Sequence, residues 1–227
     1  MATVTAWAAE LRQLDADDWV DHLVEHSGLP GPRANTTLVT AAAEVADAEV
    51  VDELVRDGGE FPMMCAAAAV ARRAALGQDA AARRFASDDR WRVREGVALG
   101  LQLLGDAEPN ALAAIVRAWA DDDNPLVVRA AVAAICEPRL LRAPETAEIA
   151  VEVCARATAH LVARLPAQRH DSAARTLRQT LGYAWSVAVA ADPGPGLLAF
   201  EALDTTDADI AWIVRENTSK KRLARLL

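Results

Sequence analysis

Three segments of this 227-residue chain share a pattern of Asp, Val and Arg, and this pattern constrains the fold more than any other feature. In each segment an Asp stands six residues before an Arg, and a Val stands directly before that Arg: Asp88, Val93 and Arg94; Asp123, Val128 and Arg129; Asp209, Val214 and Arg215. The first two arginines are 35 residues apart, and the third follows 86 residues later, with a degenerate copy over 169–178 between them. Repetition at about 35 to 45 residues, with two helices in each period, is typical of α-solenoids.

The residues within and between these segments favour helix. Hydrophobic residues make up 52% of the chain and aromatic residues only 4%, alanine is frequent, and β-branched runs are short. An apolar stripe at helical spacing follows the first copy of the pattern: Val93, Val97, Leu101 and Leu104. We therefore predict an all-α fold, as a right-handed, armadillo-like α-solenoid of about five or six helical hairpins.

Turn and capping residues mark where helices begin and end. The Gly- and Pro-rich segment 28–35 predicts a turn, Gly58-Gly59 a helix end, and Pro62 the first turn of a helix. Asn124-Pro125 forms a good cap and first-turn pair, and Asp88 or Asp89 can accept hydrogen bonds from free amides at a helix start. The expected helices before the first copy cover about 6–26 (as one helix or two), 36–46, 49–56, 62–76 and 79–85. Within 62–76, four consecutive alanines would let a neighbouring helix approach closely.

The Asp-x-x-x-x-Val-Arg segments resemble HEAT repeats, including the HEAT-like bacterial repeats related to phycobilin lyases and DNA alkylation repair proteins. The resemblance extends over about residues 60–227 and is weak before residue 60. The end of the chain, from Trp212 through Leu223, looks like the end of bacterial HEAT-repeat proteins of unassigned function. In these repeats the Asp and Arg commonly form ladders between successive repeats, so the resemblance implies a structural role for Asp88, Arg94, Asp123, Arg129, Asp209 and Arg215.

Charge is distributed unevenly along the chain, whose formal net charge is −9. Residues 1–60 contain thirteen acidic residues and three arginines, whereas residues 217–227 contain four basic residues and no acid. An acidic balance argues against nucleic acid as a partner, but here it describes one end of the molecule. We predict a single solenoid domain over 1–227, in which 1–60 are divergent acidic cap repeats and 61–227 are HEAT-like repeats with a basic tail.

Arginine and tryptophan supply the candidate binding residues. Each repeat arginine could pair with an aspartate, or several could form a basic stripe for a phosphate backbone, because the second helices of a solenoid line its concave face. Trp91 and Trp212 stand three residues before a repeat arginine, where the middle copy has Leu126, which favours packing over stacking against a base. The candidate concave-face binding residues are Arg90, Trp91, Arg92, Arg175, Arg178, Trp212, Lys220, Lys221 and Arg222.

Two function classes remain open from the sequence. The first is a non-enzymatic HEAT-repeat scaffold that binds a protein or peptide on its concave face, with no catalytic residue and no cofactor. The second, which the resemblance admits, is a DNA-binding protein or DNA glycosylase of the alkylation-repair type, with aromatics and an aspartate around a cationic base. Its candidate residues are Trp91, Trp119, Trp185 and Asp88 or Asp89. The acidic N-terminal quarter and the presence of only two lysines favour the scaffold.

Histidine and cysteine spacing gives no metal motif. His22 and His26 are four residues apart and share a helical face, but an HExxH site needs a Glu directly after the first His, and Leu23 stands there. We therefore predict solvated surface histidines and no metal. Cys65, Cys136 and Cys154 fit neither a disulfide framework nor a zinc site, so we expect small buried hydrophobes. No stretch is long and apolar enough for a membrane span, and the N-terminus lacks a signal-like pattern, so we expect a cytoplasmic protein without membrane partners.

Overall fold

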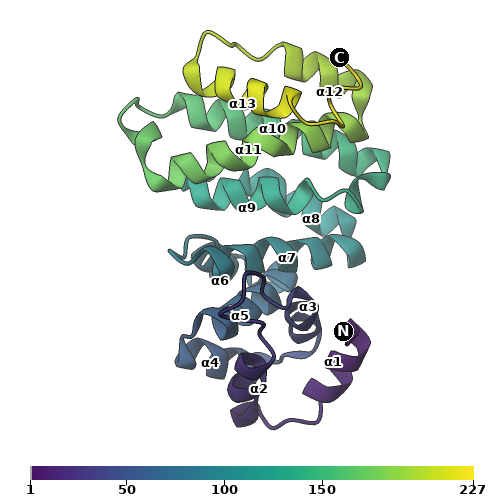
Figure 1. Cartoon of the computed structure of the whole chain (residues 1–227), viewed down its shortest axis with the longest axis vertical. Helices are drawn as coiled ribbons and strands as arrows, with labels where there is room; N and C mark the ends of the chain where they lie inside the picture. Colours follow the sequence, from purple (N-terminus) through teal and green to yellow (C-terminus); the bar gives the residue numbers. More distant parts are fainter. Residues whose placement is uncertain (1) are drawn as a thin grey trace. The chain divides into compact units, whose positions relative to one another are not determined.

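The computed structural model describes residues 2–227 and contains helices but no β-strand among them, so the predicted all-α class is confirmed (Figure 1). The chain divides into two compact units, Met1–Ala107 (unit 1) and Glu108–Leu227 (unit 2). None of the helices formed by the described residues combines the length and apolar character needed to cross a bilayer.

Unit 1 is built from short helices joined by tight turns. In chain order its elements are α1 (Val4–Leu11), η1 (Ala16–Asp18), α2 (Trp19–Glu25), α3 (Thr36–Val45), α4 (Ala48–Asp57), α5 (Glu60–Arg72), η2 (Ala74–Leu76), α6 (Asp79–Ala86) and α7 (Trp91–Ala107). The expected N-terminal segment is thus two helices. The helix expected over 62–76 ends at Arg72 and is followed by a separate 3₁₀ turn.

One hydrophobic core runs through the first half of unit 1. Leu11, Leu23, Leu38 and Leu54 are fully buried in the same cluster as Phe61 of α5. The cluster thus contains residues on both sides of position 60, and most of the acidic side chains of 1–60 are exposed.

Helices α5 and α7 make the closest packing in unit 1, side by side in Figure 1. An ideal Cβ atom added at Gly96 would overlap the carbonyl oxygen of Met64, and one added at Gly100 would overlap that of Ala68. The same atom at Gly100 would lie 2.8 Å from the Cβ of Ala71. The alanines of α5 thus lie against two glycines of α7, because any larger pair of side chains would hold the two backbones apart.

Several helix ends form as the sequence predicts. Gly58 ends α4 with a positive φ of 74°, a conformation that glycine adopts without a steric penalty. Pro62 lies in the first turn of α5, and Asn124 caps α9 by accepting a hydrogen bond from the Leu126 amide at 3.0 Å. The stripe over α7 is buried: Val93, Val97, Leu101 and Leu104.

Unit 2 has longer helices. Its elements are α8 (Pro109–Trp119), α9 (Pro125–Ile135), η3 (Leu140–Arg142), α10 (Pro144–Ala163), η4 (Gln168–His170), α11 (Ser172–Ala191), α12 (Pro193–Glu201) and α13 (Ala208–Thr218). Four of these α-helices begin with a proline, whose fixed φ suits the first helical turn: α8, α9, α10 and α12.

Helix α11 lies between α9 and α13 and packs along both (Figure 1). Asn217 of α13 is fully buried at this contact. Its side-chain oxygen accepts from the Ser186 amide at 2.8 Å, and its amide group donates to the carbonyl oxygens of Leu181 at 2.8 Å and Ile213 at 2.7 Å. A buried amide that is fully hydrogen-bonded in this way ties α13 to α11 in one register.

We expect Gly100→Ala to destabilise unit 1 by about 1–3 kcal/mol, because the new methyl group must push α5 away from α7. Urea unfolding followed by circular dichroism measures the loss. Gly194→Ala is the matched control: Gly194 lies in α12 with no atom within 4 Å of its ideal Cβ, so alanine there should be neutral or stabilising by roughly 0.5–1 kcal/mol. Equal stability of the two variants would contradict this packing.

We expect Asn217→Ala to lower the free energy of unfolding of unit 2 by about 1–3 kcal/mol, since it removes the side-chain partner of buried main-chain groups on both helices. The same denaturation experiment tests it. Thr218→Ala, which removes an exposed hydroxyl bonded only to the Arg215 carbonyl, should change stability by less than about 0.5 kcal/mol. A loss for Thr218→Ala as large as that for Asn217→Ala would rule out a special role for the buried amide.

Candidate functional site

A pocket of about 320 Å³ opens on the surface of unit 1 beside the first turns of α7. Its apolar lining comes from α5, α7 and the loop before α3: Met64, Ala98, Leu99, Pro32 and Ala34. Polar side chains reach it from the loop before α3, from the start of α3 and from α7: Arg33, Thr36, Arg92, Glu95 and Gln102. Trp91 completes the lining, and we call this site the Trp91 pocket. Its volume lies at the lower end of the range for small-ligand pockets, so it can hold a small group or an amino-acid side chain.

Trp91 is unusually exposed for its size, at 60% of its surface. It is the first residue of α7, so its side chain projects at the start of the helix. The Arg92 guanidinium carbon lies 5.4 Å from the centroid of the Trp91 ring, within cation–π range. Arg92 also donates to Glu60 at 3.0 Å, which anchors its guanidinium to the first turn of α5. The buried Nε of Arg92 has no hydrogen-bond partner within residues 2–227.

Arg33 adds a second cation to the pocket. Its side chain is exposed and makes no hydrogen bond or ion pair with any residue in 2–227. An uncommitted guanidinium beside an exposed indole and an apolar floor can bind a carboxylate next to an apolar side chain. Arg33 and Glu95 were not singled out from the sequence, because no local spacing connects a loop arginine at 33 with a helix that begins at 91.

The loop before α7 is held by Asp88. Its carboxylate accepts from the Arg90 amide at 2.8 Å and pairs with the Arg90 guanidinium at 2.8 Å. The hydrogen bond from the Arg90 side chain is the main reason that the pKa of Asp88 lies below its ordinary value. Arg90 also donates to the Gly58 carbonyl at 2.6 Å, and Arg94 donates to the main-chain carbonyls of Asp88 and Asp89. Asp88, Arg90 and Arg94 thus position the start of α7, and the pocket is lined by Trp91 and Arg92.

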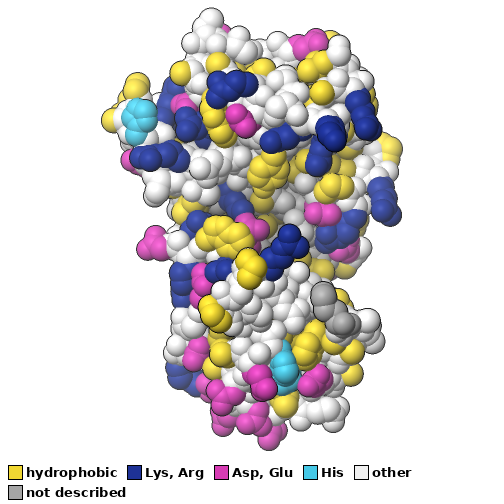
Figure 2. All heavy atoms as spheres, viewed as in Figure 1, with side chains coloured by type: hydrophobic (Ala, Val, Ile, Leu, Met, Phe, Trp, Pro, Cys, Tyr) yellow, Lys and Arg dark blue, Asp and Glu magenta, His cyan; other side chains and the backbone are white. Residues whose placement is uncertain are grey.

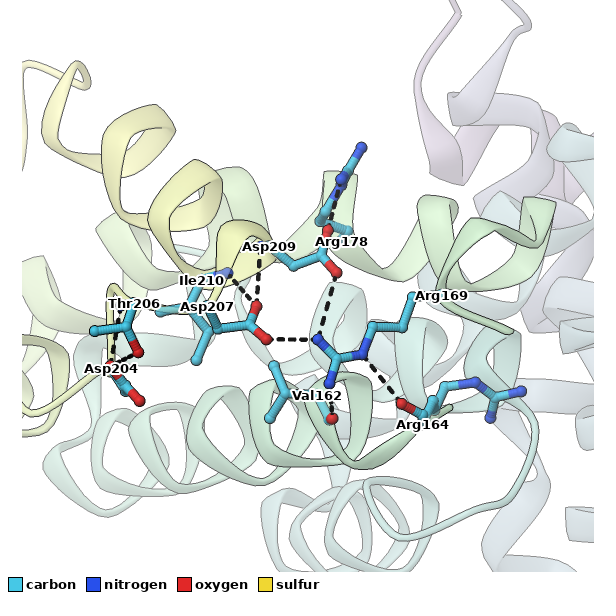
Figure 3. A network of polar contacts seen from close by, with 9 residues as sticks. All are labelled: Val162, Arg164, Arg169, Arg178, Asp204, Thr206, Asp207, Asp209 and Ile210. Atoms are coloured by element: carbon cyan, nitrogen blue, oxygen red, sulfur yellow. Dashed lines mark hydrogen bonds and ion pairs between the residues drawn. The ribbon is translucent and has the colours of Figure 1, made fainter. Parts of the chain in front are cut away.

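In unit 2, Arg178 belongs to an ion-pair network between η4, α11 and α13, which Figure 3 shows. Arg169 pairs with Asp207 at 2.5 Å, and Arg178 pairs with Asp209 at 2.6 Å. Arg169 also donates to the carbonyl oxygens of Val162 and Arg164. Arg169 thus binds residues of three neighbouring segments, whereas Arg178 pairs with Asp209 and its buried Nε has no hydrogen-bond partner in the described part of the chain.

Trp212 packs against the backbone of α11. An ideal Cβ added at Gly182 would lie 2.8 Å from the Trp212 ring, and the Arg178 guanidinium carbon lies 4.9 Å from the ring centroid. Trp212 is half-buried in this arrangement, whereas Trp91, at the same position of the repeat pattern, is exposed. The two tryptophans consequently have different environments.

The other residues singled out from the sequence lie in varied places. Arg175 donates to the His170 carbonyl at 2.7 Å, and Arg215 lies exposed with Glu216 at 3.8 Å. Arg129 is buried, and the carbonyl of Asp123 accepts from Arg164 at 3.1 Å. In the tail, Lys221 and Arg222 are exposed and Lys220 is partly exposed; Arg222 lines a separate hollow with Leu141 and Val187. Trp119 and Trp185, candidates for stacking against a base, are fully buried in unit 2.

The three cysteines are buried and free, as the sequence predicts. The sequence did not indicate that Cys136 and Cys154 touch: their sulfur atoms lie 3.6 Å apart between the end of α9 and α10. Burial raises the pKa of the Cys65 thiol, which favours the protonated form. Hydrogen bonding to Cys136 and burial together raise the pKa of Cys154.

Among the described residues, one group of side chains could hold a metal ion: Glu10, His22 and His26 of unit 1. His22 does not match the expectation of a solvated surface histidine, because only 13% of its side chain is exposed. Trp7 of α1 packs against both imidazole rings, a contact that spacing along α2 alone cannot predict.

Comparison with known protein families, curated proteins and solved structures finds no match to this chain.

The ion pairs of α13 predict that the stability of unit 2 depends on pH. Burial alone would raise the pKa of Asp207, but hydrogen bonds from Arg169 and from the Ile210 and Asp209 amides lower it, and the result is a pKa below the ordinary value. Because the pKa of Asp207 is lower in the folded chain than in the unfolded chain, where it is about 3.9, the ionised carboxylate stabilises the fold at pH values above about 3.9. This stabilisation is lost as the pH falls through the pKa of the folded chain. Unit 2 should therefore lose stability as the pH drops from about 5 toward 3.

Asp207→Asn should keep the α13 cap, since Asn caps as well as Asp, but remove the charge. We expect a loss of about 1 kcal/mol at neutral pH and a flatter stability profile below about pH 5, measured by urea unfolding at several pH values. Glu201→Gln, an exposed change in α12, serves as control. An unchanged acid profile in Asp207→Asn would refute the assignment.

Proposed function

We propose that this chain is a non-enzymatic binding scaffold, an α-solenoid of HEAT-like helical hairpins, which holds a peptide segment of a protein partner. The observation that carries the proposal is the Trp91 pocket, where a 60%-exposed indole stands over an apolar hollow beside an unpaired arginine. Tryptophan and arginine are, with tyrosine, the residues enriched among those that dominate binding energy at protein interfaces.

The chemistry of the pocket describes the peptide that would fit. Met64, Ala98 and Leu99 provide an apolar floor for one hydrophobic side chain. Arg33 supplies a guanidinium without an internal partner for a neighbouring carboxylate. Arg92 is already paired with Glu60, so its contribution is to hold the indole by cation–π attraction. The partner segment is therefore an apolar residue flanked by Asp or Glu.

The repeat pattern supports the scaffold. The Asp-Val-Arg segments over 88–94, 123–129 and 209–215 lie at the first turns of α7, α9 and α13. Val93 and Val128 are buried, whereas in α13 the buried apolar residues are Ile210 and Ile213 and Val214 is half-buried. Stacked repeats of this kind generate extended surfaces for chain segments. The concave face of such a solenoid is where we expect the remainder of the partner to bind.

The DNA glycosylase alternative has less support. Asp88, one candidate for the aspartate, is committed to Arg90, and two candidate tryptophans are buried in unit 2. The carboxylate that does line the Trp91 pocket is Glu95. Excision from alkylated duplex DNA that is abolished by Trp91→Ala would favour this alternative over the scaffold.

We predict that peptides selected from a random display library on the full chain contain an apolar residue next to an acidic one. Trp91→Ala and Arg33→Glu should each weaken binding of a selected peptide by roughly tenfold or more, because each removes an anchor worth about 1.4 kcal/mol or more. Isothermal titration calorimetry with the synthetic peptide measures the change.

The controls change similar groups away from the pocket. Leu198→Ala removes a large hydrophobic side chain, 72% exposed in α12, and Arg225→Glu reverses an exposed charge in the tail. Both should bind as the unmodified chain does. Selection of basic peptides, or equal weakening by the control variants, would argue against the Trp91 pocket as the binding site.

A further inference from the structure

Two histidines and a glutamate converge on the surface of unit 1, away from the residues that line the Trp91 pocket. His22 lies in α2, His26 caps the end of that helix, and Glu10 lies in α1. One potential ligand atom from each residue lies within 4.8 Å of those of the other two. The Glu10 carboxylate oxygen is 3.8 Å from Nε2 of His22.

The local fold creates this convergence. Residues four apart on a helix share a face, so α2 presents both imidazoles to α1. On α1, Glu10 follows Trp7 by three residues, which places both on the face toward α2. The Trp7 ring centroid lies 5.9 Å from that of His22 and 5.0 Å from that of His26, and the two imidazoles are 4.7 Å apart. Ring contacts on these sides limit the freedom of both imidazoles.

The group contains an unsatisfied ligand atom. Nε2 of His22 is buried and has no hydrogen-bond partner among the described residues, although buried polar atoms normally have one. The Glu10 side chain, in contrast, is 52% exposed and can change rotamer. An imidazole nitrogen held in place and a mobile carboxylate beside it can close around an ion.

We infer that Glu10, His22 and His26 form a binding site for a divalent first-row transition ion, with zinc as the representative ion. Two imidazoles and one carboxylate, with a fourth position open to water, is a common zinc ligand set. Bond lengths of about 2.0–2.2 Å place tetrahedral ligand atoms roughly 3.4 Å apart. The three atoms lie within 4.8 Å of one another, so each pair must approach by at most about 1.4 Å, through rotation of the Glu10 and histidine side chains. Imidazole ligands favour transition ions over calcium or magnesium, which prefer oxygen.

The surroundings favour a cation. Residues 1–60 carry thirteen acidic residues against three arginines. Figure 2 shows acidic side chains gathered over the part of unit 1 that contains α2 and α4, with a histidine side chain among them. An ion held between Glu10 and the two histidines would join α1 directly to α2. Along the chain these two helices are connected by residues 12–18, which include η1. Bound zinc therefore stabilises unit 1 as well as occupying a site.

Titration of the tag-free full chain with zinc chloride tests the inference by calorimetry, together with thermal unfolding and the visible absorption of bound cobalt. We expect one saturable ion per chain, a higher unfolding temperature in zinc, and the absorption of tetrahedral cobalt. His26→Gln and Glu10→Gln should each weaken zinc binding by roughly tenfold or more and remove the zinc-dependent rise in unfolding temperature.

Two matched variants serve as controls. Glu25→Gln makes the same charge change on α2 outside the group, and His170→Gln removes an exposed histidine of unit 2. Both should bind zinc as the unmodified chain does, and circular dichroism establishes that every variant is folded. Absence of saturable binding, or binding that survives in Glu10→Gln and His26→Gln, would overturn the site. Equal weakening by the controls would also overturn it, since the ion would then be held by general surface charge.

Discussion

The close contact between α5 and α7 is the constraint on which the organisation of unit 1 depends. Gly96 and Gly100 leave no side chain between α7 and the main chain of α5, where Met64 and Ala68 lie. Because the two backbones touch, the first turn of α7 lies close to the beginning of α5, and Arg92 can reach Glu60. The Trp91 pocket is a consequence of this packing, since its floor combines Met64 of α5 with Ala98 and Leu99 of α7.

In unit 2, helices pack through polar side chains as well as through small residues. Gly182 makes room for Trp212 against α11, but the register of α13 is set by Asn217 and by the pairs of Arg169 and Arg178 with Asp207 and Asp209 (Figure 3). These ion pairs are half-buried, so desolvation offsets much of their attraction, and their main contribution is to hold α13 in register. Trp212 thus packs in the space that Gly182 leaves on α11, whereas Trp91, in the corresponding position of the repeat, is exposed.

Sequence patterns predicted those features of the fold that depend on residues close together in the chain. The apolar stripe of α7, the cap at Asn124 and the end of α4 at Gly58 follow from helical periodicity and from the conformational preferences of single residues. The sequence also indicated that the alanines after Pro62 would face a close neighbour. The sequence could not indicate which distant residues meet, because this depends on tertiary packing. Examples are Arg33 at the Trp91 pocket, Glu10 beside the two histidines, and the contact of the Trp7 ring with His22.

Peptide binding at Trp91 is tested most directly by the indole N–H signals of the six tryptophans in a ¹H–¹⁵N spectrum. During titration with a selected peptide, the Trp91 indole signal should shift and saturate, while those of the buried Trp119 and Trp185 stay in place. A saturable shift confined to tryptophans of unit 2, with the Trp91 signal unmoved, would contradict the account.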